Sequence, residues 1–248
     1  MITDEKFKEI VAETGFLLNE KEINEFKTYY KLLTEKNKVV NLTAITEYDD
    51  VVIKHFADSL LVKKVIRNLK NESNEIKEPE EAKIADVGTG AGFPGVPIKI
   101  CCPNSEITLI DSLNKRIKFL EEIIDELGLK GIKTVHGRCE DIGQSKEFRE
   151  KYDLCLSRAV ANLAVLSEYC LPLVKTGGFF IAYKSSDADE EINNAHNAIK
   201  RLGGELCCVN KEILPGSDIK RSFCVIKKIA HCPAKYPRQA GIPTKKPL

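Results

Sequence analysis

Residues 84–95 read IADVGTGAGFPG, a short apolar run that leads at once into a loop rich in glycine. Glycine allows the chain to turn sharply, and it allows a ligand to approach the backbone closely. Asp86 ends this run, and Asp111 ends the next run, ITLID, about 20 residues after the loop. A carboxylate in that position can accept hydrogen bonds from ribose hydroxyls. The stretch therefore predicts a strand–loop–helix turn that binds a nucleoside-type ligand.

The acids beside the loop favour one cofactor over others that use similar loops. The pattern G-x-G-x-G serves NAD, FAD and S-adenosylmethionine sites alike. Asp86 would add to the negative charge of a pyrophosphate, and Phe93 and Pro94 stand where the next helix begins. A sulfonium ligand is positively charged and has no phosphate, so a nearby acid favours its binding. We therefore expect S-adenosylmethionine as the cofactor, with an NAD-dependent oxidoreductase as an alternative.

From Ile84 onward, apolar runs alternate with amphipathic segments, and the runs read IADV, ITLI, IKTV, DLCL and FFIAY. This alternation is typical of βα units on a parallel sheet. Residues 205–209 and 223–227 are strand-like and flank a turn at 215–216, which predicts a terminal antiparallel pair. The expected fold class is α/β: a Rossmann-like, doubly wound, mostly parallel sheet with an antiparallel terminal strand and an N-terminal helical cap.

The spacing of apolar residues predicts N-terminal helices at 4–13, 20–36 and 47–67, with Asn19 as the N-cap of the second. Residues 68–82, NLKNESNEIKEPEEA, are polar and highly charged, as in a linker. The final segment is basic, contains no acid and has no core of its own. The predicted organisation is a helical subdomain at 1–67, a linker at 68–82, an S-adenosylmethionine-binding domain at 83–230 and a basic tail at 231–248.

The composition limits the possible partners. With 38 Lys and Arg against 37 Asp and Glu, no strong positive field covers the molecule, so RNA affinity must come from local clusters of cations. Nine cysteines without C-x-x-C or Cys/His ligand spacing predict no metal site. The odd number of cysteines, without a secretory segment, indicates the cytoplasm. No apolar run approaches the roughly 20 residues that cross a bilayer, so we expect no membrane contact, and we expect a monomer.

Six motifs stand out along the chain: NLTAI (41–45), KHFADS (54–59), DVGTGAGFPGVP (86–97), DSLNKR (111–116), SRAVA (157–161) and YPRQAGIPTKKPL (236–248). Among them, DVGTGAGFPG followed by DSLNKR and SRA, in that order and spacing, is far more specific than any one of these three. In these motifs the chain resembles the ribosomal small-subunit methyltransferase G family (RsmG, also called GidB). The resemblance covers nearly the whole chain from residue 37. It implies a class I methyltransferase fold and N7 methylation of a guanine in the 530 loop of 16S rRNA, either as RNA or within the small ribosomal subunit. The chain departs from the family at Lys54 and in the long linker, and neither departure touches the cofactor loop.

The resemblance also implies the residues of the site. The implied cofactor contacts are Gly88 and Phe93 in the loop, Asp111, Ser112 and Leu113 at the ribose, Cys139 and Glu140 near the adenine, and Arg158. Guanine N7 offers a lone pair and has no proton to lose, so its attack on a sulfonium methyl needs correct positioning and no general base. We expect Arg158 to act in catalysis by positioning.

Several other side chains have more than one interpretation. His55 and Asp58, one helical turn apart, could be a base and its orienter, but a helix-surface pair or a contact between subdomains is preferred. Arg158 could meet the guanine edge, a phosphate or the cofactor carboxylate, or form a plain salt bridge. Lys184 is a phosphate candidate, and Tyr236 either stacks on a base or packs against the domain. The cations expected to contact RNA are Lys115, Arg116, Lys118, Lys235, Arg238, Lys245 and Lys246.

Two further functions stay open at this point. A methyltransferase that acts on a protein or a small molecule would need a substrate pocket but no basic tail. A non-catalytic ribosome-binding module would tolerate a degenerate cofactor loop, and the intact Gly88, Gly90, Gly92 and Asp111 argue against it.

Overall fold

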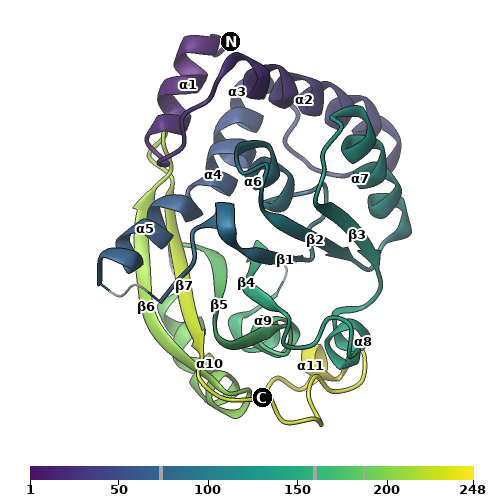
Figure 1. Cartoon of the computed structure of the whole chain (residues 1–248), viewed down its shortest axis with the longest axis vertical. Coiled ribbons are helices and arrows are strands. Elements are labelled where there is room, and N and C mark those ends of the chain that lie inside the picture. Colours follow the sequence, from purple (N-terminus) through teal and green to yellow (C-terminus); the bar gives the residue numbers. More distant parts are fainter. Residues whose placement is uncertain (73–74, 159–160, 187) are drawn as a thin grey trace.

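The computed structural model describes residues 1–72, 75–158, 161–186 and 188–248, and within them one seven-stranded sheet forms the centre of the molecule (Figure 1). The strands are β1 (Lys83–Val87), β2 (Glu106–Asp111), β3 (Ile132–His136), β4 (Tyr152–Arg158), β5 (Val174–Ser185), β6 (Gly204–Ile213) and β7 (Lys220–Lys228). Their order is β3-β2-β1-β4-β5-β7-β6; β1 to β5 are parallel, and β7 is antiparallel to both of its neighbours. The predicted fold class and the predicted terminal antiparallel pair are therefore confirmed.

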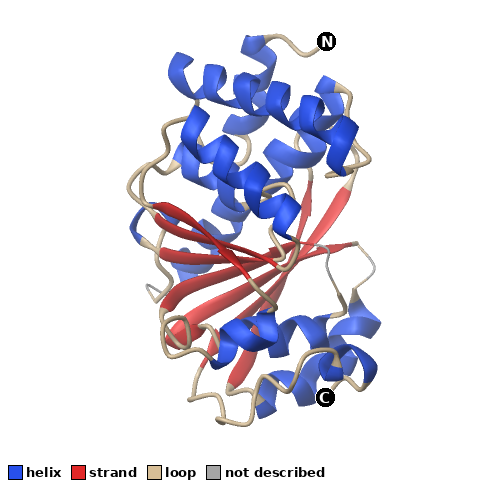
Figure 2. Cartoon of the chain, turned by 90° about the vertical axis from the view of Figure 1, so that its right-hand side faces the viewer, coloured by secondary structure: helices blue, strands red, loops and turns tan. Residues whose placement is uncertain are grey.

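Helices cover both faces of this sheet (Figure 2). One face carries α1 (Asp4–Ala12), α2 (Glu20–Val40), α3 (Tyr48–Val51), the π-helix η1 (Val52–Ala57), α4 (Asp58–Leu60), α5 (Val62–Glu72), α6 (Gly95–Cys101) and α7 (Asn114–Glu126). The other face carries α8 (Cys139–Gln144), α9 (Leu163–Cys170), α10 (Asp189–Arg201) and α11 (Ile242–Lys245). Successive residues of a strand point to opposite faces, so Ile84 packs in the first apolar core and Ala85 in the second. A strand covered on both sides is apolar throughout, and this explains the unbroken apolar runs.

The N-terminal helices differ from their predicted bounds. Asn19 forms a complete capping box with Glu22 at the start of α2, as its side chain suggested. The predicted helix at 47–67 is four consecutive helical segments, α3, η1, α4 and α5, which together extend to Glu72. The predicted subdomain boundary at residue 67 thus falls inside α5. In the predicted linker, Leu69 and Ile76 are buried in the first core and Pro79–Glu81 form the 3-10 helix η2, while residues 73–74 lie outside the described residues.

The C-terminal segment packs along α8 and α9 (Figure 1). Cys232 and Tyr236 are buried in the second core. The guanidinium of Arg149 donates to three carbonyl oxygens of the segment, and Gln144 donates to two more. The segment shares the second core of the sheet through Cys232 and Tyr236. No helix in the described part of the chain is both long and apolar enough to span a membrane.

Candidate active site

The glycine-rich loop connects β1 to α6, and three of its glycines have positive φ. The angles are 70° at Gly88, 61° at Gly90 and 106° at Gly92, a region that other residues rarely adopt. A Cβ added at Gly92 would lie 2.7 Å from the hydroxyl of Tyr29, which donates to the carbonyl of Ala91 at 2.6 Å. Among the described residues beyond its chain neighbours, a Cβ added at Gly90 would meet only the Gly88 carbonyl oxygen, at 4.0 Å. The loop is therefore fixed by α2 on one side and open to a ligand on the other.

Asp86 lies buried behind this loop. Its Oδ2 accepts hydrogen bonds from the Thr89 hydroxyl at 2.6 Å and from the Gly95 amide at 2.8 Å. Its Oδ1 is buried and has no hydrogen-bond partner among the described residues. Burial raises the pKa of the Asp86 carboxyl to about 6, while the two hydrogen bonds oppose this shift. A buried carboxylate with an unused oxygen is stabilised by a positive group nearby, so the loop suits a cationic ligand.

Asp111, the expected ribose acid, is in direct contact with the same loop. Its Oδ2 accepts from the Gly90 amide at 3.0 Å, and its Oδ1 accepts from the Leu113 amide at 2.8 Å. Arg116 donates to Oδ2 at 3.3 Å. A carboxylate has about four lone-pair sites, so these contacts leave acceptor capacity for a ribose.

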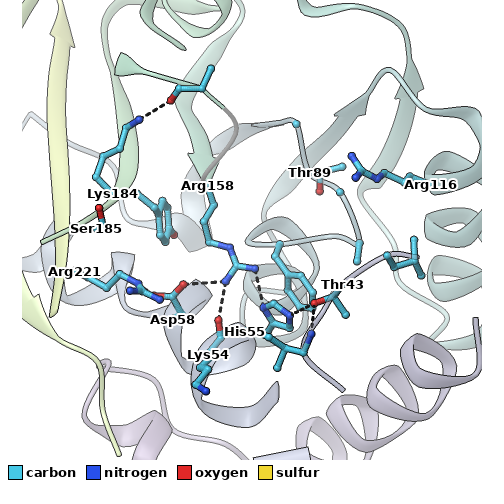
Figure 3. Close-up of a pocket in the computed structure, with 18 of the residues that line it drawn as sticks. Thr43, Lys54, His55, Asp58, Thr89, Arg116, Arg158, Lys184, Ser185 and Arg221 are labelled. Carbon is cyan, nitrogen blue, oxygen red and sulfur yellow. Dashed lines mark hydrogen bonds and ion pairs between the residues drawn. The ribbon is translucent and has the colours of Figure 1, made fainter. Parts of the chain in front are cut away.

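A cavity of about 940 Å³ opens beside the loop (Figure 3). Its size is near the upper end of the roughly 300–1,000 Å³ found for ligand sites. Its wall includes five cations and two acids: Lys54, Arg116, Arg158, Lys184 and Arg221, with Asp58 and Glu191. This excess of cations attracts an anionic ligand.

Arg158 crosses from the end of β4 to the N-terminal helices (Figure 3). Its Nη1 donates to Asp58 Oδ2 at 2.9 Å and to the Lys54 carbonyl at 3.1 Å. Its Nη2 donates to His55 Nδ1 at 3.0 Å, and its guanidinium lies over the Phe93 ring, 5.0 Å from the centroid. The salt bridge that the sequence left as an alternative for Arg158 is therefore present, and the arginine also lines the cavity.

His55 is a neutral partner in this cluster. Arginine can only donate, so Nδ1 accepts, and the proton resides on Nε2, which faces the Thr43 hydroxyl at 2.8 Å. Burial, together with the charge of Arg158, lowers the pKa of His55 to about 3. The ring stacks on Phe93 with centroids 4.4 Å apart. These facts argue against His55 as a general base.

The preferred interpretation of His55 and Asp58 is half right. The two residues are buried, with 7% and 2% of their surfaces exposed, so a helix-surface pair is wrong. They do form a contact between the N-terminal helices and the sheet, through Arg158. Asp58 also accepts from a second arginine, Arg221 of β7, whose Nε lies 2.7 Å from Oδ1.

The structure divides the expected cofactor contacts into two groups. Gly88, Phe93 and Arg158 line the cavity. The others lie at the neighbouring carboxyl ends of β2 and β3, outside the cavity wall: Asp111, Ser112, Leu113, Cys139 and Glu140. In this group Ser112 and Leu113 are exposed, whereas Glu140 is buried and accepts from the Gly241 amide at 2.9 Å.

Several expected RNA contacts are occupied by protein. The ammonium of Lys184 pairs with Glu191 and donates to the Ala161 carbonyl at 2.6 Å. Arg238 is bound to Glu168, and Tyr236 is 6% exposed, so for Tyr236 the packing interpretation holds. In the SRAVA motif, Ala159 and Val160 lie outside the described residues.

Arg221 was not identified from the sequence. It is the second residue of β7, a strand of otherwise ordinary composition, and only the antiparallel pairing of Ser185 with Arg221 brings it to the carboxyl end of β5. A prediction of that register would have been needed to find it.

Together, the sheet order, the loop after β1 and the acid at the end of β2 define a class I methyltransferase. A variant of MtNAS in complex with S-adenosylmethionine has the same fold, with a TM-score of 0.52 and 15% identity, over 92% of this chain and 85% of that chain. TYW2 of M. jannaschii in complex with AdoMet gives a TM-score of 0.50 and 11% identity, over 65% and 76% of the two chains.

The particular family follows from the sequence relatives. A family model described as rRNA small subunit methyltransferase G matches residues 22–215. The ribosomal RNA small subunit methyltransferase G of Desulforamulus reducens is 52% identical over 97% of this chain and 96% of its own length. That of Lactobacillus johnsonii is 50% identical over 98% and 99%. The chain belongs to the rRNA small subunit methyltransferase G family, which excludes the NAD-dependent oxidoreductase considered as an alternative.

Proposed function

We propose that this chain transfers a methyl group from S-adenosylmethionine to N7 of a guanine in the 530 loop of 16S rRNA. The observation that carries the proposal is the pairing of family membership with an open, cation-rich cavity beside the glycine loop. A small ribosomal subunit as partner, a cytoplasmic location and a monomeric state belong to the same proposal.

The residues present fit S-adenosylmethionine. The open side of Gly90 leaves room for a ligand against the backbone. Asp111 lies next to that space as the proposed ribose acceptor. Behind the loop, Asp86 adds negative charge, and its Oδ1 has no hydrogen-bond partner in the described part of the chain. A ligand with a positive sulfur and no phosphate is compatible with both acids. The other proposed cofactor contacts are Gly88, Phe93, Ser112, Leu113, Cys139, Glu140 and Arg158.

The chain's own residues then position the guanine and exclude water. Bound S-adenosylmethionine supplies an electrophilic methyl group. Since N7 attacks with a lone pair, no residue has to remove a proton, and neutral His55 is not required as a base. Arg158 carries only donors and can donate to guanine O6. It must leave the N7 lone pair free, and its bonds to Asp58 and His55 restrict the direction in which it donates.

Methyl transfer is tested with labelled S-adenosylmethionine. Small subunits and naked 16S rRNA from a strain that lacks the enzyme serve as substrates, and the labelled base is mapped. We expect label on a guanine N7 in the 530 loop. Cofactor binding without label in any RNA would contradict the proposal and favour a protein or small-molecule substrate.

The cofactor loop is tested with Gly88→Asp, which adds a side chain and a negative charge in the loop. We expect S-adenosylmethionine affinity to fall by more than about 100-fold, since φ at Gly88 is positive and the added group fills the ligand space. Gly177→Asp is the matched control, because Gly177 also has positive φ and a Cβ there meets nothing within 4 Å. Isothermal titration with equal affinity for both variants would refute the assignment of the loop.

A further inference from the structure

Arg221 lies at the end of the cavity that is far from the glycine loop. Its strand, β7, pairs with β5, and Arg221 is in register with Ser185, the last residue of β5. Strands β4 and β5 separate β7 from β1. At about 4.8 Å per strand, Arg221 starts roughly 14 Å along the sheet from the loop that would hold the cofactor. Arg221 therefore lies at the end of the cavity that would hold the substrate.

The other cations of the cavity wall each have an acid of their own. Lys54 pairs with Asp50 at 2.8 Å, and Arg116 pairs with Asp111 at 3.3 Å. The third such cation, Lys184, pairs with Glu191. Their charges are therefore largely neutralised within the protein.

Arg158 and Arg221 share a single carboxylate. Asp58 binds Arg158 through Oδ2 and Arg221 through Oδ1, and the neighbouring His55 is neutral because its pKa is lowered to about 3. The two guanidiniums therefore carry one positive charge more than Asp58 balances. A partly buried excess charge favours binding of an anion.

Arg221 keeps its planar donor end available. The bond to Asp58 uses Nε, and Nη1 has only a long contact of 3.4 Å with the Lys220 carbonyl. Among the described residues, neither Nη atom contacts an acid, and 23% of the side chain is exposed. Two Nη groups held in a fixed plane match the geometry of a phosphate.

We propose that Arg221 binds a phosphate of the RNA substrate through its Nη groups, with Asp58 as the residue that positions both arginines. This inference rests on the proposed function, since it assumes that the substrate is RNA. A nucleotide whose base reaches Arg158 can extend its phosphates toward Arg221, at the end of the cavity away from the glycine loop. The cofactor carboxylate is the competing anion, but the glycine loop that would hold the cofactor lies at the opposite end.

The test compares Arg221→Met with Arg201→Met. Both changes remove one positive charge, but Arg201 is exposed at the end of α10 and does not line the cavity. Affinity for unmethylated small subunits is measured from 50 to 250 mM salt, and S-adenosylmethionine affinity is measured separately. For Arg221→Met we expect RNA affinity to fall about tenfold, as for the loss of one charge-assisted hydrogen-bonded contact. The slope of log K against log salt should shrink by about 0.7 to 1. Cofactor affinity should stay within about twofold, since the change lies far from the cofactor loop.

Three results would overturn the inference. If only cofactor affinity falls, Arg221 binds the cofactor carboxylate. If neither affinity changes, it serves only to hold Asp58. If Arg201→Met has the same effect, net charge alone is responsible.

Arg221→Lys keeps the test decisive should the Met variant not fold. Lysine keeps the charge but loses the planar fork, so we expect a severalfold loss of affinity with an unchanged salt slope. Affinity equal to that of the unsubstituted protein would contradict a bidentate contact. A chain that binds small subunits but methylates no RNA would refute the proposed function and leave this binding test intact.

Discussion

Two buried acids bind arginines from distant parts of the chain, and the two arrangements differ in charge and access. Glu168 receives Arg238 through the backbone amide, Nε and Nη2, at distances from 2.6 to 3.2 Å. In this arrangement one acid pairs with one base, and neither residue lines the cavity. Asp58 meets two bases, and all three residues line the cavity.

The difference separates a structural pair from a functional one. A neutral, bidentate pair such as Glu168–Arg238 can fix the C-terminal segment against α9. The Asp58 cluster leaves one uncompensated positive charge beside an open cavity. Such a charge is not needed for holding the elements together. Arg158 and Arg238 were both candidates for RNA contact, and only Arg158 lies in the cavity wall. Uncompensated charge at a cavity is thus a better guide to function than a basic sequence segment.

The largest effect is expected from Asp58→Asn. The amide keeps the shape but leaves two guanidiniums close together without a counter-charge. Breaking a buried ion pair in this way costs about 3–5 kcal/mol, and we expect kcat/KM for methyl transfer to fall by more than about 100-fold as Arg158 loses its orientation. Urea unfolding and single-turnover assays measure the two quantities.

Asp50→Asn is its control, since Asp50 is a half-exposed acid two turns earlier that pairs with Lys54. Exposed pairs contribute about 0–1 kcal/mol. If the Asp58 variant were as stable and active as this control, the cluster would not be a positioning device.

A smaller effect, on stability more than on catalysis, is expected from Glu168→Gln. The loss of the carboxylate from a pair that is 1% exposed on the acid side should destabilise the fold by about 3 kcal/mol. Residues 231–248 should then exchange amide hydrogens faster. Because the Gly241 amide holds Glu140, cofactor affinity should fall a few-fold.

Glu126→Gln, on the exposed end of α7, is the comparison variant. Methyl transfer could fall as far in Glu168→Gln as in Asp58→Asn while cofactor affinity stays unchanged. That result would contradict the assignment of Glu168 as a structural acid and Asp58 as a functional one.

The sequence alone was sufficient for features that depend on local pattern. The runs around Ala85 are apolar because both faces of the sheet are covered, and the glycines of the loop are needed where φ is positive. Both requirements restrict the residue types at neighbouring positions of the sequence. The sheet, the loop and the acid Asp111 could therefore be predicted.

Features that depend on distant partners could not be predicted in this way. Asp58 contacts residues 100 and 163 positions away, and nothing near it in sequence identifies them. Residues 68–72 have the composition of a linker, yet they continue α5 because Leu69 is buried in the first core. The tail is basic and has no core pattern of its own in sequence, yet Glu168 and Arg149 bind it to the domain. In each case tertiary contacts override the local composition.

The pH dependence of stability provides a finer test of the neutral His55. The pKa of His55 falls from about 6.5 in the unfolded chain to about 3 in the fold, so between about pH 6.5 and pH 3 the proton binds to the unfolded chain and not to the fold. Stability is therefore lost as the pH falls from 6.5. Asp86 acts oppositely between pH 3.8 and 6, since its folded pKa is raised to about 6.

His55→Gln removes one of these opposing contributions while it keeps a donor and an acceptor. Relative to the unsubstituted protein, the variant should gain about 2 kcal/mol of unfolding free energy between pH 6.5 and 5, at about 1.4 kcal/mol per pH unit. Urea unfolding at the two pH values measures this, with the exposed His196→Gln as the control. A constant difference between variant and unsubstituted protein would mean that His55 is protonated in the fold, which its bond from Arg158 forbids.

The smallest effect should distinguish the two ends of the molecule as RNA contacts. Lys115 and Lys118 are exposed at the start of α7, next to Arg116 of the cavity wall, whereas Lys245 and Lys246 are exposed in the C-terminal segment. Each double alanine variant removes two charges, so a general field would weaken RNA binding equally in both. If the cavity side binds RNA and the tail is structural, the α7 variant should lose about threefold in affinity for small subunits at 100 mM salt, and the tail variant less than about twofold. Equal losses would assign the contribution to net charge. A larger loss in the tail variant would restore the basic tail as an RNA contact, because Lys245 and Lys246 remain exposed even though Arg238 is bound to Glu168.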